Sequence, residues 1–155
     1  MNQSIFSRFI ITIIPWLPLW FMRIIAGRYV AGEDQKDALQ IARELNDKGY
    51  SVTIDILGEH SKSIKLSTSI TEQYIELYQA IQSSQLDCNI SIKPTHLGLD
   101  ISIKCARDNI LELLKIAEET HNYLRIDMEN SAVTDTTFYL YEICKEQFSA
   151  VGIVL

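Results

Sequence analysis

Apolar and polar residues follow two different periods along this chain of 155 residues. Strict alternation sends successive side chains to opposite faces of a strand, whereas apolar residues spaced three or four apart line one side of a helix. Alternation predicts strands at residues 51–57, 89–93, 123–130 and 150–155. Helical spacing predicts helices at residues 34–48, 71–83, 106–120 and 134–148. The predicted order is therefore helix then strand, repeated along the chain.

The strands end at regular intervals. Their ends at Leu57, Lys93 and Met128 are about 35 residues apart, which is typical of a repeated βα unit and indicates a parallel sheet. Both an open doubly wound sheet and a (β/α)₈ barrel have this repeat. The dinucleotide-binding form of the open sheet needs a glycine-rich turn after its first strand, and the segment LGEHS at residues 57–61 is not one.

Each predicted strand carries polar residues on one alternate face, where a barrel has its interior and its site at the carboxyl ends of the strands. These residues are Thr53, Asp55, Ser91, Lys93, Arg125, Asp127 and Glu129. A complete barrel takes about 250 residues. The sequence therefore predicts an α/β fold made of the first half, about four βα units, of a (β/α)₈ TIM-like barrel. We expect an apolar N-terminal arm at residues 1–30 and the incomplete barrel domain at residues 31–155.

The arm contains an uncharged run at residues 9–22, bracketed by Arg8 and Arg23. The run is shorter than the about 20 residues that a membrane-spanning helix needs, and Pro15 and Pro18 interrupt it. A secretory signal fits less well, since no small-residue cleavage site follows directly. Two interpretations stay open. The arm either packs on its own domain or lies in a membrane interface, as its tryptophans beside arginines suggest.

Composition and charge narrow the class of protein. Hydrophobic residues make up 47% of the chain and charged residues 22%, which is typical of a folded globular domain. The net charge of −6 argues against a nucleic-acid binder, which would need a basic surface.

The cysteines and histidines indicate no metal site. Cys88, Cys105 and Cys144 fall in no metal-binding or CxxC spacing, so we expect reduced thiols in a reducing, cytoplasmic compartment. The histidines at positions 60, 96 and 121 are not spaced like metal ligands either, and we expect no metal.

Lys93 and Asp127 are the leading candidates for chemistry. They end neighbouring predicted strands, so both side chains would point to the top of the barrel interior. Their opposite charges would keep each other ionised, and a purely structural ion pair is the alternative. Asp55 and Glu59 lie at the same mouth, in either a structural or a functional role.

Two further charged residues share this face. Arg125 lies deeper, and we expect it to be a structural partner of Asp127 or of Asp55. Glu129 lies past the strand end, where it is either solvated or caps a loop.

Five sequence blocks together resemble one family. They are YVAGE at residues 29–33, VTIDILGE at 52–59, SIKPTHLGL at 91–99, RIDME at 125–129 and VGIVL at 151–155. In this order and with these gaps, they resemble the successive blocks of the monofunctional proline dehydrogenases, whose domain also occurs in bifunctional proline-utilisation proteins. The resemblance implies a distorted (β/α)₈ barrel that binds FAD. It also implies that hydride passes from C5 of L-proline to the flavin, which gives Δ1-pyrroline-5-carboxylate, and that electrons then pass to a membrane quinone.

The resemblance assigns roles to individual residues. Lys93 matches the family lysine that contacts the substrate carboxylate, Asp127 the active-site aspartate, and Met128 a residue that touches FAD. It also implies a cytoplasmic enzyme, with possible peripheral contact on the inner face of the membrane through the arm.

The chain also departs from the family pattern. The family's glutamine-containing flavin stretch and its carboxylate-gripping arginine pair follow the block at 151–155, and they are absent here. Two interpretations remain: the N-terminal part of a proline dehydrogenase, or a non-catalytic half-barrel that is a remnant or an interaction module. In both cases we expect residues 1–155 alone to be inactive and poorly soluble or oligomeric, because a half-barrel leaves a sheet edge open.

Overall fold

The computed structural model describes residue 32 and residues 34–154. The arm predicted at residues 1–30 lies outside the described residues. The chain divides into two compact units, Met1–Ile41 and Ala42–Leu155. The described part of the first unit consists of Gly32 and the start of helix α3 (Gln35–Asn46). The rest of α3 and all described strands belong to the second unit.

A parallel sheet organises the second unit. Its described strands are β1 (Val52–Asp55), β2 (Cys88–Ile92), β3 (Leu124–Ile126) and β4 (Val151–Ile153), and they lie in the order β1-β2-β3-β4. The register aligns Asp55 with Ser91, Ser91 with Arg125, and Arg125 with Gly152. A doubly wound sheet would reverse its strand order at a switch point, whereas a barrel adds each strand beside the last. The sequential order confirms the barrel-type prediction.

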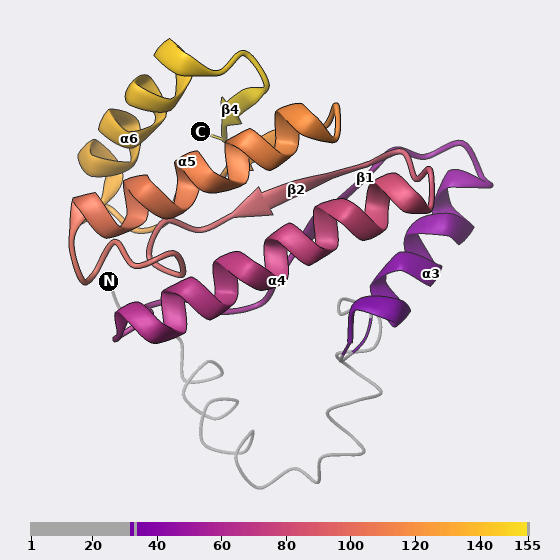
Figure 1. Cartoon of the computed structure of the whole chain (residues 1–155), viewed down its shortest axis with the longest axis horizontal. Coiled ribbons are helices and arrows are strands. Elements are labelled where there is room, and N and C mark those ends of the chain that lie inside the picture. Colours follow the sequence, from indigo (N-terminus) through magenta and orange to yellow (C-terminus); the bar gives the residue numbers. More distant parts are fainter. Residues whose placement is uncertain (1–31, 33, 155) are drawn as a thin grey trace, which may run out of the picture. The chain divides into compact units, whose positions relative to one another are not determined.

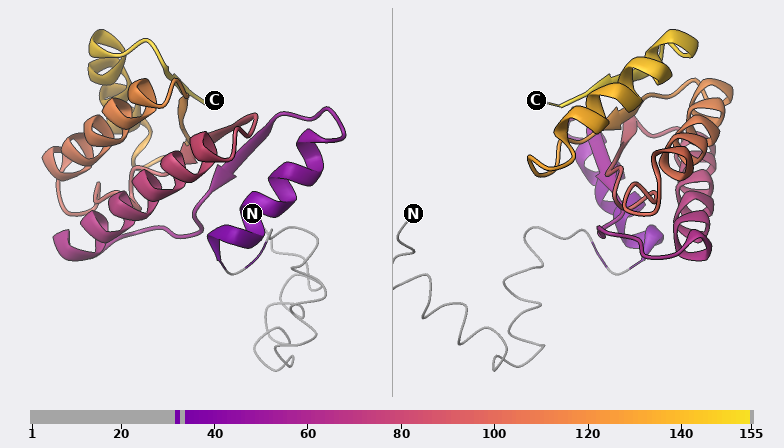
Figure 2. Two further views of the ribbon diagram at one scale, coloured as in Figure 1. Left: turned by 45° about the vertical axis from the view of Figure 1, so that its right-hand side comes forward. Right: turned by 90° about the vertical axis from the view of Figure 1, so that its left-hand side faces the viewer.

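Helices α4 (Ile64–Ser83), α5 (Ile103–Glu119) and α6 (Thr134–Gln147) connect the strands and lie on one face of the sheet (Figures 1 and 2). Alternate strand residues meet the apolar sides of these helices and form the core. Its fully buried members include Tyr74, Ile81, Ile90, Ile92, Ile110, Leu113, Leu114, Leu124, Ile126 and Leu140. The opposite, polar face of the sheet is therefore the face that a closed barrel would enclose.

Helix α4 begins earlier than the sequence predicts. Ser63 caps it, with its Oγ accepting the Leu66 N–H at 3.2 Å, so the helix start predicted at residue 71 is wrong. Polar residues in the first turns of α4 made this segment look non-helical, but two of them are buried within the helix. The hydroxyls of Ser67 and Thr71 donate to the carbonyls of Ile64 and Ser67 at 3.0 and 2.9 Å, which removes the cost of burying them.

Strand β3 is shorter than the predicted strand at residues 123–130. Its ladder ends where the Asp127 N–H meets the Ile92 carbonyl at 2.9 Å and the Val154 N–H meets the Ile126 carbonyl at 3.0 Å. Just past the end of the neighbouring strand β2, Pro94 has no N–H with which to continue the ladder. Met128 and Glu129 consequently lie in the loop after β3.

A glycine caps the end of helix α3. Gly49 has φ +85°, a left-handed conformation that glycine adopts at little cost, and its N–H donates to the Asn46 carbonyl at 2.8 Å. The Asn46 side chain then holds the start of β2. Its amide donates to the Asp87 carbonyl at 3.0 Å, and its oxygen accepts the Asp87 N–H at 2.9 Å.

Among the described residues, no helix has both the length and the apolar character required to cross a bilayer.

Candidate active site

Lys93 and Asp55 form an ion pair at the carboxyl ends of β1 and β2. The Lys93 Nζ lies 2.6 Å from Asp55 Oδ2, and the two side chains are only 20% and 24% exposed. Tyr74, from α4, donates its hydroxyl to Asp55 Oδ1 at 3.0 Å. Burial and the Asp55 charge raise the Tyr74 pKa, so this hydroxyl keeps its proton at neutral pH. Asp55 is thus fixed on one side by tyrosine and on the other by lysine.

The lysine stays charged in this setting. Burial alone lowers the Lys93 pKa, but the hydrogen bond and charge of Asp55, together with the charge of Asp127, outweigh burial and raise it. Lys93 is therefore a fixed, partly accessible cation on the polar face of the sheet. An ammonium has three donors, so the bond to Asp55 leaves donors for a ligand.

Asp127 has one partner that the sequence predicts and one that it does not. Its Oδ1 accepts from the Ser91 hydroxyl and from Arg125 Nε, the latter at 3.2 Å. Among the described residues, no direct bond between Lys93 and Asp127 is recorded, although the Asp127 charge helps to raise the Lys93 pKa, as the opposite charges predict. Continuing the register sets Lys93 level with Asp127, two residues beyond the level of Asp55, but the ammonium reaches across to Asp55 instead. Arg125 as the structural partner of Asp127 is confirmed.

Glu129 caps a loop, which confirms one of its two predicted roles. Its Oε2 accepts the Thr95 N–H at 3.0 Å, and its Oε1 accepts the Thr95 hydroxyl at 2.5 Å. Met128 lies between Asp127 and Glu129 and is half-buried. The sequence does not predict this role for Thr95, because no sequence pattern marks a loop threonine as a residue with several hydrogen-bond partners.

The histidines near this mouth have separate environments. His60 is exposed, and its Nδ1 lies 2.7 Å from Asp100 Oδ2, a bond that raises its pKa. His96 is 7% exposed, and burial lowers its pKa. In the part of the chain that the structure describes, no three His, Cys, Asp or Glu side chains are grouped so as to hold a metal ion.

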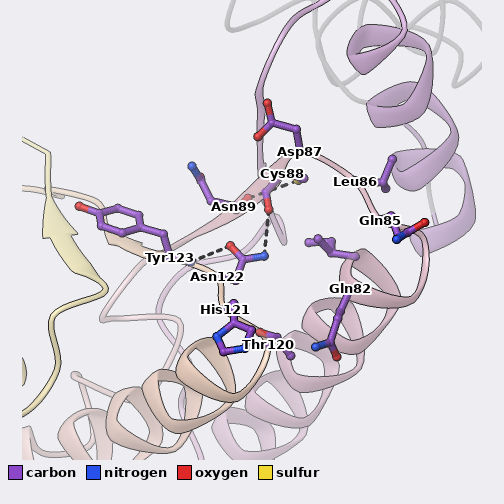
Figure 3. A pocket seen from close by; sticks show the side chains of 11 residues that line it. Gln82, Gln85, Leu86, Asp87, Cys88, Asn89, Thr120, His121, Asn122 and Tyr123 are labelled. Carbon is purple, nitrogen blue, oxygen red and sulfur yellow. Dashed lines mark hydrogen bonds between the residues drawn. The ribbon is translucent and has the colours of Figure 1, made fainter.

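A surface pocket lies at the opposite end of the strands. It is lined by the ends of α4 and α5 and the starts of β2 and β3 (Figure 3). One of its polar side chains, Asn122, bonds to the backbone on two sides. The Asn122 amide donates to the Cys88 carbonyl at 3.0 Å, and Asn122 Oδ1 accepts the Tyr123 N–H at 2.6 Å. The charged groups lie instead at the carboxyl ends of the strands, where barrel enzymes have their active sites.

Comparison with known proteins shows the family of this chain. A family model described as proline dehydrogenase matches residues 38–155. Proline dehydrogenase 1 of Bacillus subtilis subsp. natto is 35% identical over 133 residues, which are 86% of this chain and 44% of that protein. Proline dehydrogenase of Deinococcus radiodurans is 28% identical over 140 residues, which are 84% of this chain and 44% of that protein.

A solved structure shares the fold. Proline utilization A from Bdellovibrio bacteriovorus, inactivated by N-propargylglycine, matches with a TM-score of 0.72 and 22% identity. The match covers 81% of this chain and 16% of that one. This likeness confirms that the sequential parallel sheet is part of a TIM-barrel type of domain. The chain spans less than half the length of the curated relatives it matches. The family match over residues 38–155 and the identity to curated relatives show that the chain belongs to the proline dehydrogenase family.

Proposed function

We propose that this chain supplies the Lys93–Asp127 half of a proline dehydrogenase site, which oxidises L-proline to Δ1-pyrroline-5-carboxylate with FAD as the hydride acceptor and a quinone as the final electron acceptor. Proline dehydrogenases are generally flavin-dependent oxidoreductases, and the chain is a member of that family. The observation that carries the proposal is the ion pair of Lys93 with Asp55, held ready at the carboxyl end of the sheet.

Lys93 is suited to hold the proline carboxylate. Its charge is secured by Asp55, and its ammonium is fixed before any ligand arrives. Charge-assisted hydrogen bonds to a carboxylate are roughly twice as strong as neutral ones. A cation that is already fixed also loses little freedom when it binds, so more of that strength appears as affinity.

Asp127 is suited to hold a second cation in the site. Ser91 and Arg125 both reach its Oδ1, and among the described residues no donor is recorded at Oδ2. That oxygen is free to orient a cationic group that closes over the substrate. Held from one side by Ser91 and Arg125, the carboxylate keeps its direction without a ligand, as a preorganised site requires.

The residues present fit one edge of a flavin site. Met128 follows Asp127 directly and is half-buried, and it offers an apolar, polarizable contact that suits an aromatic ring system. When bound, FAD would accept the hydride that leaves proline, while the protein supplies position and charge. Met128 is the residue of this chain that we assign to the cofactor.

The test is a graft that supplies the remaining strands. The 133-residue matching segment of the Bacillus subtilis relative is replaced by the corresponding segment of this chain, and bound flavin and proline-to-dye electron transfer are measured. We expect activity in the graft. Lys93→Ala should raise KM for proline by about tenfold or more, and Asp127→Ala should lower kcat by a similar factor. Lys104→Ala is the matched control, since that side chain is 77% exposed on α5.

The alternative is a non-catalytic half-barrel. A graft that folds and retains flavin but leaves proline unoxidised would support that alternative and contradict the proposal. Cytoplasmic location, with peripheral membrane contact through residues 1–30, belongs to the same proposal. The membrane contact is tested by measuring whether the full chain sediments with vesicles that contain a quinone.

A further inference from the structure

Thr95, in the loop after β2, is fully buried and forms hydrogen bonds with residues of the two neighbouring loops. Its N–H and its hydroxyl both donate to the Glu129 carboxylate, at 3.0 and 2.5 Å. The same hydroxyl oxygen accepts the His60 N–H at 3.3 Å, and the Thr95 carbonyl accepts the Ser61 N–H at 3.0 Å. Every polar group of Thr95 is therefore used, and its exposed fraction is 0%. These hydrogen bonds are costly to lose, because they lie in a buried or partly buried setting where an unpaired group is poorly compensated by water.

These bonds join the loops at the carboxyl ends of neighbouring strands. His60 and Ser61 belong to the connection after β1, and Glu129 to the connection after β3. Ser61 adds a second link, since its hydroxyl donates to the His96 carbonyl at 2.6 Å. The loop after β2 is thus fastened on both sides.

Lys93 lies at the root of this fastened loop. Its carbonyl accepts the N–H groups of His96 and Leu97 at 3.0 and 3.2 Å, so the turn begins directly at the lysine. The Lys93 backbone can therefore move only if the turn moves. The turn is held by Thr95, which lies two residues further along the chain.

We propose that Thr95 is a positioning residue for Lys93: by tying the loop after β2 to the loops after β1 and β3, it keeps the Lys93 ammonium at Asp55 and directed toward the substrate carboxylate. Loss of the hydroxyl loosens the turn and lets the lysine stem leave Asp55. The part that concerns the substrate rests on the proposed function, whereas the part that concerns the Lys93–Asp55 contact does not.

The first experiment uses the full 155-residue chain and no substrate. Lysines are labelled by ¹³C reductive methylation, and the Lys93 signal, assigned with Lys93→Arg, is titrated by NMR. We expect the Lys93 pKa to lie above the ordinary lysine value. Thr95→Val removes the hydroxyl at nearly constant volume and should lower the Lys93 pKa toward that ordinary value. Thr95→Ser keeps the hydroxyl and should retain the upward shift.

A second variant covers the case in which Thr95→Val does not fold. Glu129→Gln keeps one acceptor oxygen but places an amide where the other oxygen accepts from Thr95, and it should reduce the Lys93 shift in part. The proposal is overturned if Lys93 keeps its shift in every folded variant. It is equally overturned if Thr95→Ser and Thr95→Val abolish the shift to the same extent.

Kinetics in the graft separate positioning from simple stabilisation. Thr95→Val should raise KM for proline about tenfold while kcat stays within about threefold, and Thr95→Ser should stay close to wild type. A purely structural role would instead lower the unfolding midpoint and the fraction of active enzyme at unchanged KM, and that result would overturn the proposal. An inactive wild-type graft would contradict the proposed function, while the titration would still decide the role of Thr95.

Discussion

The two faces of the sheet use the same strands for opposite purposes. On the face toward the helices, Ile90, Ile92, Leu124 and Ile126 are all 0% exposed. On the other face, Lys93, Arg125 and Asp127 are between 20% and 39% exposed. Lys93 is paired with Asp55, and Arg125 is paired with Asp127. One face gains its free energy by removing apolar area from water. The other holds charges that stabilise little but are fixed in place.

The difference shows that residues which stabilise the fold and residues which form the site alternate along the same strand. A strand places adjacent side chains on opposite faces, so Ile92 supports the core while its neighbours Ser91 and Lys93 belong to the site. We therefore expect substitutions at adjacent positions to have very different consequences.

The largest effect should come from the helix-facing side of β3. Ile126→Ala should lower the free energy of unfolding by about 2–5 kcal/mol, because it leaves a cavity in a close-packed core. Arg125→Met, one position away, should cost about 1 kcal/mol or less, since its ion pair with Asp127 is partly exposed. Urea unfolding of both variants makes the comparison. Equal losses would contradict the separation of the two faces.

A smaller effect should appear where the polar face is crowded. A Cβ added at Gly152 would overlap the Tyr123 hydroxyl. Because Tyr123 is 40% exposed and its ring can shift, Gly152→Ala should cost about 1–3 kcal/mol rather than prevent folding. The double variant with Tyr123→Phe should recover part of the loss. If thermal unfolding shows the two changes to be additive, Tyr123 is not the obstacle.

A change within the charged network should be smaller still. Ser91→Ala removes the hydroxyl that donates to Asp127, and it should cost about 0.5–1.5 kcal/mol of stability. In the active graft it should lower kcat more than Lys104→Ala does, because Asp127 loses part of its orientation. Stability equal to wild type together with unchanged kinetics would show that Arg125 alone fixes the carboxylate.

Alkaline pH should affect the helix-facing side first. Burial raises the pKa of the Cys144 thiol to about 11, so its stabilising protonated form is fully present below the ordinary thiol pKa and is lost between about pH 9 and 11. The Lys93 pKa is also raised, and its contribution is lost only as pH rises through that raised value, above about 10.4.

Cys144→Ala should therefore flatten the decline of unfolding free energy between pH 9 and 10 more than Lys93→Met does. Urea unfolding at several pH values in this range measures the two slopes. If Lys93→Met reduced the slope more than Cys144→Ala does, Lys93 rather than Cys144 would account for the loss of stability in this pH range.

Much of the fold follows from periodicity alone. The predicted strands and the parallel βα repeat appear in the structure, because alternation and helical spacing are local properties of the chain. The first part of α4 could not be predicted in this way. Its serine and threonine hydroxyls bond to the helix's own carbonyls, so residues that look like a linker are buried inside a helix.

The site was predicted as a set of residues but not as a set of contacts. Lys93, Asp127, Asp55 and Arg125 gather at one end of the sheet as alternation requires. Their pairing depends on where each side chain reaches, because continuing the register would set Lys93 level with Asp127. Lys93 instead bonds to Asp55, and Tyr74 reaches that pair from a helix.

The sequence by itself determined which side chains share a face and which family they resemble, because both are recorded in local order and spacing. Only the tertiary structure decided that Lys93 bonds to Asp55, that Ser91 bonds to Asp127, and that Thr95 ties the loops together. These contacts join residues about 34 to 38 positions apart. They exist because parallel strands bring their carboxyl ends to one edge, a consequence of strand pairing that no short stretch of sequence contains.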